Sequence, residues 1–518
     1  MKEIPLATQI KASDIYAVQQ LGISSLQLME LAAGAVVATL KAEGKLTSNQ
    51  KFQIWCGGGN NGGDGLAIAR KLFLLGAKVE VFCPFADQLV GDAAWQWKQV
   101  QQMPIEKLSH PPIPDLKAIG IDALTGTGFT GLLKEPLHTW IKDWSTSGQE
   151  VVAIDLPSGL SSDSGAVEGP VVQAQMSISF GYPRIAHYVY PAAKYCGKVI
   201  IADIGLPVTP STSNPTYRFC GDGKWFYENL ILRPVDGHKG TSGSVMVIGG
   251  NNHMAGAPLL TSKAAYRAGA GLVRVLMPAI HISALYGFLP EAIGIPTTEK
   301  NAFSIKDVNH IEEYVSNTAS WVIGPGIGRS HATQMAVIAF LEMLKKSAHK
   351  CVMDADALHA IKNDLAVLSP DCILTPHPGE FAALLDIPVQ QLQENRLEYA
   401  EEFVRKHPCV LVLKGAGTLV VSPNGNTGIC TLGDPVLSSA GSGDILAGLI
   451  GGWLAQGYAS DIAAMLGVIQ HARAGEILAQ KGILLMGLVR MEISQIFPAI
   501  TQALLEMGSQ NISNQNDF

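Results

Sequence analysis

The sequence predicts an α/β fold divided into at least two domains. The chain has 518 residues, more than one typical domain contains. It is 47% hydrophobic and only 16% charged, and it contains 54 glycines. Buried parallel strands joined by glycine-containing loops have this composition. Short apolar runs also alternate with helical segments along the chain, as they do in parallel sheets.

Charge, cysteine content and apolar runs argue against several classes of protein. The net charge is −7 and there is no long basic block, which argues against a nucleic-acid partner. The eight cysteines are scattered without metal-ligand spacing, and several lie in apolar runs, as buried reduced thiols do. Residues 1–14 have no apolar signal core, and no uninterrupted apolar run could span a bilayer. We therefore expect a soluble cytoplasmic protein without a membrane partner.

The first elements form a strand, a glycine-rich loop, a helix and a second strand. Residues 13–46 have a helical pattern, and residues 52–56 form a short apolar strand. Residues 57–65 (GGGNNGGDG) are then predicted to be a loop, residues 66–75 a helix and residues 78–82 the next strand.

The predicted loop contains the G-x-G-x-x-G spacing of dinucleotide-binding folds. The match is incomplete, because the second strand has no acid at its tip to bind a ribose. The loop also contains Asn60, Asn61 and Asp64, side chains that the plain motif does not need. We interpret it as a pocket wall that supplies ligands, and the alternative is a turn held by Asn and Asp hydrogen bonds.

Two further strands end in carboxylates. Residues 117–124 contain Asp122, and residues 150–154 lead to Asp155 and Ser158. Ligands of an open parallel sheet bind outside the carboxyl ends of its strands, so these groups and the loop at 60–64 would share one crevice. Taken singly, each acid is more often a loop or cap residue. Oxygen ligands of this kind suit a hard cation better than zinc.

A domain boundary is predicted near the middle of the chain. Residues 207–214 (PVTPSTSN) are polar and contain proline, and we place the boundary between about 210 and 230. The expected domains are residues 1–213 and 226–510. A second α/β series follows the boundary. Its strands are expected at 244–248, 271–276, 320–323, 350–353, 372–374 and 409–413, and one helix at 257–268.

The strongest candidate site of the second half is residues 434–444 (DPVLSSAGSGD), which precede an apolar helix at 445–454. Free amides at a helix start suit a phosphate, and Asp444 beside them could move a proton. The alternative is a glycine-rich turn with Asp as a cap. Residues 414–418 (KGAGT) form a second possible anion loop, and two such loops fit a nucleotide with more than one phosphate. Neither has Walker A spacing.

Three other polar residues at strand ends have two interpretations each. His377 lies between two prolines and near Glu380, and it could be structural or functional. Asp354 and Asp356 could bind Mg²⁺ or cap the helix that follows, and we favour capping.

The first half resembles the NAD(P)H-hydrate epimerase family, through GGGNNGGDG, IDALTGTG, VVAIDLPSGL and the segment at 180–207. The resemblance covers about residues 1–210 and implies a Rossmann-like three-layer αβα domain that acts on NAD(P)H with a hydrated nicotinamide ring. It also implies that Asp155 contacts the substrate as acid/base and that Asn61, Asp122 and Ser158 bind K⁺. The other implied substrate-binding residues are Asn60, Asn61, Gly62, Gly63, Asp64, Gly126, Thr127, Gly128, Phe129, Thr130, Gly131 and Leu132. Residues 180–194 are richer in Tyr and His than that family's pattern.

The second half resembles the ADP-dependent NAD(P)H-hydrate dehydratase family. HKGTSGSVMVIGG, AGAPLLTSKAAYRAGAGLVRVL, GPGIG, VMDADAL, TPHPGEF, KGAGT and AGSGD follow in that family's order over about residues 230–505. The resemblance implies a ribokinase-like α/β domain with ADP as co-substrate, Mg²⁺ as cofactor and Asp444 as acid/base. The implied nucleotide-binding residues are Lys414, Gly415, Ala416, Gly417, Thr418 and Gly443. The implied hydrate-binding residues are Ala257, Gly326, His377 and Asp444. Residues 434–439 and a closing helix at 481–495 depart from the family's pattern.

These resemblances predict a bifunctional metabolite repair enzyme. It would epimerise the R and S forms of hydrated NADH and NADPH and dehydrate the S form, converting ADP to AMP and phosphate. The alternative is a ribokinase-like small-molecule kinase with a non-catalytic N-terminal binding domain. We also expect a homo-oligomer.

Overall fold

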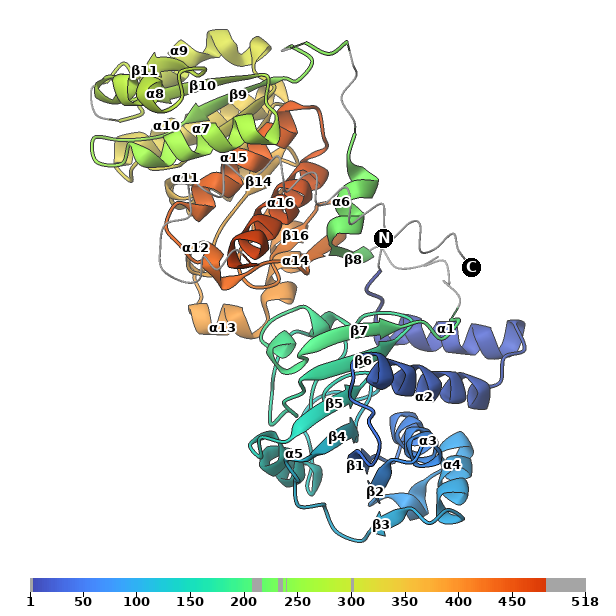
Figure 1. The fold of residues 1–518 in the computed structure, drawn as a ribbon. Coiled ribbons are helices and arrows are strands. Elements are labelled where there is room, and N and C mark those ends of the chain that lie inside the picture. Colours follow the sequence, from blue (N-terminus) through green and yellow to red (C-terminus); the bar gives the residue numbers. More distant parts are fainter. Residues whose placement is uncertain (1–2, 207–216, 232–235, 239, 300–301, 481–518) are drawn as a thin grey trace. The chain divides into compact units, whose positions relative to one another are not determined.

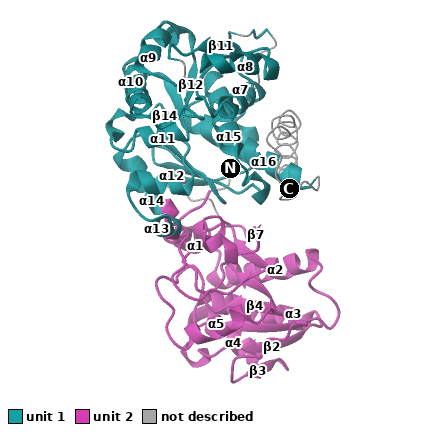
Figure 2. Cartoon of the chain, turned by 90° about the vertical axis from the view of Figure 1, so that its left-hand side faces the viewer, with its two compact units in different colours: residues 1, 218–393, 398–518 teal, residues 2–217, 394–397 magenta. Residues whose placement is uncertain are grey.

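The computed structural model describes residues 3–206, 217–231, 236–238, 240–299 and 302–480. The chain separates into two compact units, coloured separately in Figure 2. The N-terminal unit contains residues 2–217 and 394–397, and the C-terminal unit contains residue 1, residues 218–393 and residues 398–518. The expected linker segment at 207–214 and the expected closing helix at 481–495 lie outside the described residues.

The N-terminal unit is built on a seven-stranded sheet in the order β3-β2-β1-β4-β5-β6-β7, and its paired strands are parallel. The strands are β1 (Lys51–Cys56), β2 (Lys78–Phe82), β3 (Glu106–Leu108), β4 (Ala118–Ala123), β5 (Glu150–Ile154), β6 (Met176–Phe180) and β7 (Lys198–Ala202). The strand order reverses at β1, which lies between β2 and β4. A crevice for a ligand is expected at this reversal, outside the ends of β1 and β4.

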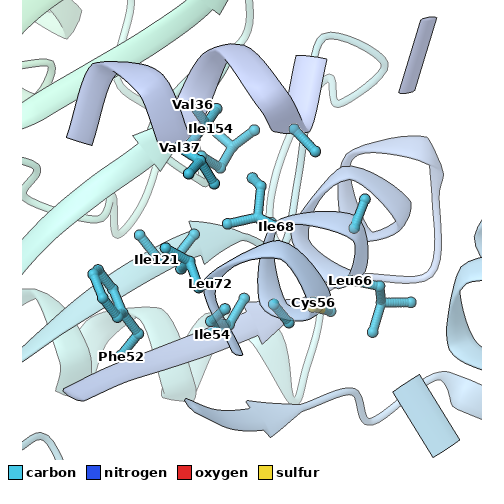
Figure 3. Packing of buried hydrophobic residues seen from close by; sticks show 14 of the residues in the cluster. Val36, Val37, Phe52, Ile54, Cys56, Leu66, Ile68, Leu72, Ile121 and Ile154 are labelled. Atoms are coloured by element: carbon cyan, nitrogen blue, oxygen red, sulfur yellow. The ribbon is translucent and has the colours of Figure 1, made fainter. Parts of the chain in front are cut away.

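Helices cover both faces of this sheet (Figure 1). The helices are α1 (Ala7–Gln20), α2 (Ser25–Ala42), α3 (Asn60–Leu74), α4 (Gly91–Gln101) and α5 (Leu137–Ser145). Phe52 and Ile54 of β1 face the core formed with α2 and α3 (Figure 3). Trp55 faces the opposite side and stacks on Trp144 of α5, with 4.4 Å between ring centroids. β1 is buried on both faces, and its last three residues are all apolar. The predicted three-layer αβα fold is confirmed.

The glycine-rich stretch at 57–65 is largely helical, so its prediction as a loop was wrong. Helix α3 begins at Asn60. A Cβ atom at Gly62 would lie 2.0 Å from the carbonyl oxygen of Gly57, and one at Gly65 would lie 2.7 Å from the Cβ of Ala123. Glycine is required at both positions because α3 packs directly on the sheet, a constraint that local sequence preference does not reveal.

Adding a single methyl group is expected to have opposite effects on stability at two helical glycines of this unit. Gly65→Ala is expected to lower the free energy of unfolding by about 1–3 kcal/mol, because the interior cannot accept the atom. Gly34→Ala is the matched control: Gly34 lies in α2 with no heavy atom within 4 Å of an added Cβ. That change is expected to stabilise by about 0.5–1 kcal/mol. Denaturant unfolding of both variants measures the difference, and equal effects would contradict the packing described for α3.

Helix α2 is the described helix that has the length and mean hydropathy of a membrane span. One face of the helix, which includes Val36 and Leu40, is nevertheless buried in the core of the unit, whereas Leu31 on the other face is exposed. Its Glu30 pairs with Arg70 and with Lys71 of α3. These contacts are those of an amphipathic helix that packs against the sheet and α3.

The C-terminal unit is built on a ten-stranded sheet in the order β11-β10-β9-β12-β13-β14-β15-β16-β17-β8. The strands from β9 to β15 pair in parallel, and β16 pairs antiparallel with both β15 and β17. The order reverses at β9, between β10 and β12. The strands are β8 (Tyr217–Gly221), β9 (Ser244–Ile248), β10 (Leu272–Met277), β11 (Ile293–Pro296), β12 (Ser320–Ile323), β13 (Lys350–Met353), β14 (Cys372–Leu374), β15 (Val410–Leu413), β16 (Leu419–Val421) and β17 (Asn426–Cys430).

Helices also cover both faces of the second sheet, with α7, α15 and α16 on one side and α9 to α12 on the other (Figure 2). A Cβ atom at Gly448 of α15 would lie 2.1 Å from the carbonyl oxygen of Thr261 in α7. This close contact lies in the middle of α15 and fixes the helix against α7. The helices are α6 (Gly223–Asn229), α7 (Gly256–Ala268), α8 (Ile282–Phe288), α9 (Ile305–Ile311), α10 (His331–Ser347), α11 (Asp356–Ala360), α12 (Pro378–Leu385), α13 (Val389–Glu394), α14 (Arg396–Lys406), α15 (Ser442–Ala455) and α16 (Ser460–Gln480).

All eight cysteines are described, and each is a buried free thiol, as the sequence predicts. Both units have the predicted α/β architecture.

Candidate functional sites

Asp155, the residue that follows β5, is held by its backbone and by its side chain. Its φ of 65° lies in the left-handed region that few non-glycine residues adopt. Its amide donates to the carbonyl oxygen of Ile178 (2.8 Å), and its own carbonyl oxygen is 2.8 Å from the Nε2 of His187. Its carboxylate accepts from the hydroxyl of Ser179 (2.9 Å) and pairs with Arg184 (2.8 Å). A strained residue with this many contacts is typical of a functional site.

Arg184 and His187 belong to this site, although the sequence analysis did not assign them. Arg184 is only 4% exposed, and its pair with Asp155 compensates its burial. The Nδ1 of His187 accepts from the amide of Arg184 (3.0 Å), so Nε2 carries the hydrogen that reaches Asp155. Burial lowers the pKa of His187 to about 4 and keeps the ring neutral. Two signals were available: Arg184 is the only Lys, Arg, Asp or Glu in residues 180–190, and the segment is unusually rich in Tyr and His.

Asp64, the fifth residue of α3, lies close enough to Asp155 for their charges to interact. Burial, followed by the charges of Asp155 and Asp14, raises the pKa of Asp64 well above its ordinary value. The fold therefore brings the predicted residues Asp64 and Asp155 near one another, and burial favours a proton on Asp64.

The three predicted cation ligands lie on one chain of hydrogen bonds. Asp122 is fully buried and accepts from the hydroxyl (2.5 Å) and the amide (2.7 Å) of Ser158. The Ser158 hydroxyl accepts from the amide of Thr125 (2.9 Å), whose carbonyl oxygen accepts from the side chain of Asn61 (2.7 Å). Burial raises the pKa of Asp122 to about 6. The cluster supplies only oxygen atoms and amide groups, the chemistry that a hard cation requires.

The predicted substrate loop at 126–132 borders this cluster at its start. A Cβ atom at Gly126 would lie 3.0 Å from the Cβ of Asn61, and the carbonyl oxygen of Thr127 accepts from the hydroxyl of Ser162 at 3.5 Å. The later residues Gly128, Thr130, Gly131 and Leu132 are exposed.

Lys414 is the centre of the C-terminal site. Its Nζ donates to the carboxylate of Asp354 (3.0 Å) and lies 3.9 Å from that of Glu380. A Cβ atom at Gly443 would lie 3.2 Å from this Nζ, so Lys414 reaches the start of α15. Burial opposes its charge, but Asp354, Glu380 and Asp444 outweigh burial and raise the pKa of Lys414. The fold thus joins the two anion loops that the sequence predicts.

The predicted capping role of Asp354 and Asp356 was wrong. The residue before α11 is Ala355, which adopts φ 50° and provides no side-chain cap. Asp354 accepts instead from the hydroxyl of Thr375 (2.8 Å) and from Lys414. Asp356 accepts from Arg329 (2.6 Å) and from the amide of Gly328 (3.0 Å). Ala355 sets the turn between the two acids, and their partners lie far away in sequence.

His377 is both a helix cap and an exposed group beside the site. Its Nδ1 accepts from the amide of Glu380 (3.2 Å), and Glu380 accepts in return from the amide of His377 (2.8 Å). The His377 side chain is 58% exposed, whereas that of Glu380 is 17% exposed. Burial raises the pKa of Glu380, although Lys414 opposes the shift.

The start of α15 is anchored to two other helices. Gly441 supplies the positive φ of 88° that precedes the helix. The main-chain oxygen of half-buried Asp444 accepts from the hydroxyl of Thr261 in α7 (3.1 Å). The hydroxyl of Ser442 is 2.9 Å from the Nε2 of His471 in α16, a contact that the sequence analysis missed.

Ala257 and Gly326, the other predicted hydrate-binding residues, lie together. A Cβ atom at Gly326, where φ is 63°, would lie 3.4 Å from the Cβ of Ala257.

Within the atypical segment at 434–439, Pro435–Leu437 forms a short turn capped by Asp434, which accepts from the amide of Val436 (2.9 Å).

His471 should make the C-terminal unit less stable in acid. Burial, with Lys414 nearby, lowers the pKa of His471 to about 4 from 6.5. Between these values only the unfolded chain binds the proton, so stability falls as pH falls below about 6.5. From pH 7 to pH 5 the expected loss is up to about 2 kcal/mol, and His471→Gln should reduce this pH dependence. Denaturant unfolding at each pH measures it, and equal slopes for both proteins would contradict the assignment.

Two family profiles match the chain. A profile described as YjeF-related protein N-terminus matches residues 25–186, and one described as NAD(P)H-hydrate dehydratase matches residues 245–499. Among solved structures, an ADP/ATP-dependent NAD(P)H-hydrate dehydratase from Bacillus subtilis, co-crystallised with ATP/Mg²⁺, covers 55% of this chain and 98% of its own. It is 27% identical, with a TM-score of 0.47.

Similarity to curated relatives extends over nearly the whole chain. The bifunctional NAD(P)H-hydrate repair enzyme Nnr of Moorella thermoacetica is 36% identical over 492 residues, which are 92% of each chain. The protein of the same name from Coxiella burnetii is 34% identical over 92% of this chain and 94% of its own. The chain therefore belongs to the family of bifunctional NAD(P)H-hydrate repair enzymes.

Proposed function

We propose that the chain repairs hydrated NADH and NADPH with two active sites. The N-terminal domain, residues 1–213, epimerises the R and S forms, and the C-terminal domain, residues 226–510, dehydrates the S form. One observation carries the proposal: the similarity to bifunctional relatives covers 92% of the chain, over both of the units that contain the sites described above. The fusion is chemically sensible, because the first reaction supplies the second with the epimer that it uses.

In the N-terminal site, Asp155 acts as the acid/base. Epimerisation breaks and re-forms a bond at the hydrated ring carbon and requires proton transfer at each step. Arg184 and Ser179 hold the Asp155 carboxylate in one orientation, and His187 holds its backbone. The remaining substrate contacts come from residues 60–64 and 126–132.

In the C-terminal site, the substrate hydroxyl must be converted into a leaving group. Transfer of the β-phosphoryl group of ADP to that hydroxyl gives AMP and a phosphate ester, and elimination then releases phosphate and forms the ring double bond. Asp444 accepts the hydroxyl proton in the first step, and the proton lost from the neighbouring ring carbon in the second step leaves with the released phosphate. Residues 414–418 and Gly443 bind the nucleotide, and Lys414 places a positive charge at the start of α15. Ala257, Gly326, His377 and Asp444 bind the hydrate.

Mg²⁺ is proposed to enter this site with the nucleotide. Among residues 3–206, 217–231, 236–238, 240–299 and 302–480, no group of three or more His, Cys, Asp or Glu side chains could hold a metal ion. Mg²⁺ commonly binds substrate phosphates, waters and only one or two carboxylates, so a magnesium site of this kind does not need three protein ligands. It would screen charge on the phosphates during transfer.

K⁺ is the proposed cofactor of the N-terminal site, with Asn61, Asp122 and Ser158 as ligands. Ser158→Ala is expected to weaken K⁺ activation of epimerisation by roughly tenfold or more, since it also removes a hydrogen bond to Asp122. Ser164→Ala, a hydroxyl change in the same unit, is the control. The measurement is the epimerisation rate against K⁺ concentration, and a rate that does not depend on K⁺ would contradict the site.

The choice of nucleotide separates this proposal from the kinase alternative. Purified protein is incubated with ADP or ATP, S-hydrate and candidate alcohols, and cofactor absorbance and phosphorylated products are followed. We expect ADP consumption and AMP formation in step with NAD(P)H recovery. Steady ATP use with a stable phosphorylated alcohol would instead establish a kinase.

The homo-oligomer and the cytoplasmic location stay predictions, tested by mass measurement in solution and by cell fractionation.

A further inference from the structure

Arg329 presents a charged group at the edge of the C-terminal sheet where ligands are expected. It follows β12, and its side chain is 60% exposed. Its Nε donates to the carboxylate of Asp356 at 2.6 Å, and that carboxylate is only 10% exposed. The other oxygen of Asp356 accepts from the amide of Gly328 at 3.0 Å. A buried acid therefore holds both the side chain and the preceding backbone of an exposed arginine.

The loop that carries Arg329 lies at the reversal of strand order. A Cβ atom at Gly328 would lie 3.1 Å from the side-chain nitrogen of Asn251, which follows β9. A Cβ atom at Gly326 would lie 3.4 Å from the Cβ of Ala257 in α7. The loops after β9 and β12 are thus in contact, and ligands bind at such a reversal in open α/β sheets.

Positive charge is scarce at this edge. Of the described loops that follow β9, β10, β12, β13, β14 and β15, only the loops of Arg329 and Lys414 contain a Lys or Arg. Lys414 is 19% exposed and is already bound to Asp354, with Glu380 nearby. A hydrated dinucleotide carries negative phosphates, which the carboxylates of this edge would repel. Arg329 is the exposed cation that could offset this repulsion.

We propose that Arg329 binds a phosphate group of the hydrated dinucleotide in the C-terminal site. This inference rests on the dehydratase function proposed above and adds a residue that recognises the substrate. The bond to Asp356 uses only Nε, so both Nη atoms can bind two oxygens of one phosphate. Asp356 acts as a positioning residue that limits the orientations of the guanidinium group.

Arg329→Gln, Arg329→Lys and a control, Lys406→Gln, are compared as full-length proteins. Lys406 forms an exposed ion pair with Glu402 on α14. The measurements are kcat and KM for the S-hydrates of NADH and NADPH, KM for ADP, and the Kd of each hydrate by calorimetry. Arg329→Gln should raise the KM and Kd of the hydrate by roughly tenfold with little change in the KM of ADP. Arg329→Lys should restore part of the loss, and the control should match the wild type.

The two hydrates identify which phosphate is bound. An equal effect on both indicates the pyrophosphate, and an effect on NADPH hydrate alone indicates its additional ribose phosphate; either result supports the proposal. Unchanged hydrate binding, or an effect confined to ADP, overturns it. A wild-type protein that binds the hydrate but does not convert it to NAD(P)H would contradict the proposed function. If Arg329→Gln still weakened that binding, the role of Arg329 would stand.

Discussion

Asp444→Asn is expected to lower the rate of S-hydrate dehydration by about 10²- to 10⁴-fold, the usual contribution of a positioned acid/base. The variant keeps the shape of the side chain and the main-chain contact between Asp444 and Thr261. The start of α15 should therefore remain in place, and ADP should bind with nearly normal affinity. The measurement is single-turnover dehydration, with ADP affinity determined separately.

Asp461→Asn is the matched control for this change. Asp461 is also an acid in the first turn of a helix in the same unit, and it accepts from Ser422 and Asn424. The control should keep its full dehydration rate. An Asp444→Asn protein that binds ADP normally and dehydrates at the wild-type rate would rule out Asp444 as the acid/base.

Asp155→Asn is expected to lower the enzymatic epimerisation rate by about 10²- to 10⁴-fold while dehydration of added S-hydrate continues. Asparagine tolerates the φ of 65° found at Asp155, so the backbone should be retained. The change leaves Arg184 buried without its carboxylate partner, so a loss of about 3–5 kcal/mol of stability is also expected. Epimerisation is therefore measured where unfolding experiments show the variant to be folded.

Asp203→Asn controls for loss of a carboxylate in the same unit, because Asp203 is exposed and accepts from the amide of the nearby Gly205. It should epimerise normally. Unchanged epimerisation in folded Asp155→Asn protein would favour the alternative in which the N-terminal domain only binds ligands.

The central strands could be predicted from the sequence because they are almost completely buried and therefore apolar, whereas β3 and β11 at the sheet edges are partly exposed and were not predicted. The predicted strand at 244–248 and the observed β9 have the same bounds, and the predicted strand at 350–353 agrees equally well with β13. Residues 60–65 were misassigned for a physical reason. Glycine lowers local helix preference, but here it allows α3 to pack against Ala123 and Gly57, contacts that only the fold creates.

Polar residues at strand ends were predictable, but their partners were not. The chain position of Asp155 suggested a site, yet its bonds to Arg184 and His187 depend on how the segment after β6 folds back. Likewise, the sequence shows Asp354 and Asp356 as neighbours two residues apart. In the structure Asp354 binds Lys414 and Asp356 binds Arg329. The two side chains reach different partners because Ala355 between them has a positive φ.

The central claim is that one chain contains both repair activities, and a mixture of hydrate epimers tests it most directly. Purified protein receives the R and S forms of hydrated NADH with excess ADP and K⁺, and both epimers are followed by chromatography. Spontaneous epimerisation, measured without protein, is subtracted. The account predicts that both epimers are consumed completely, faster than spontaneous epimerisation allows, with AMP formed in equal amount to NADH. Consumption of the S form alone, with the R form declining only at the spontaneous rate, would contradict it.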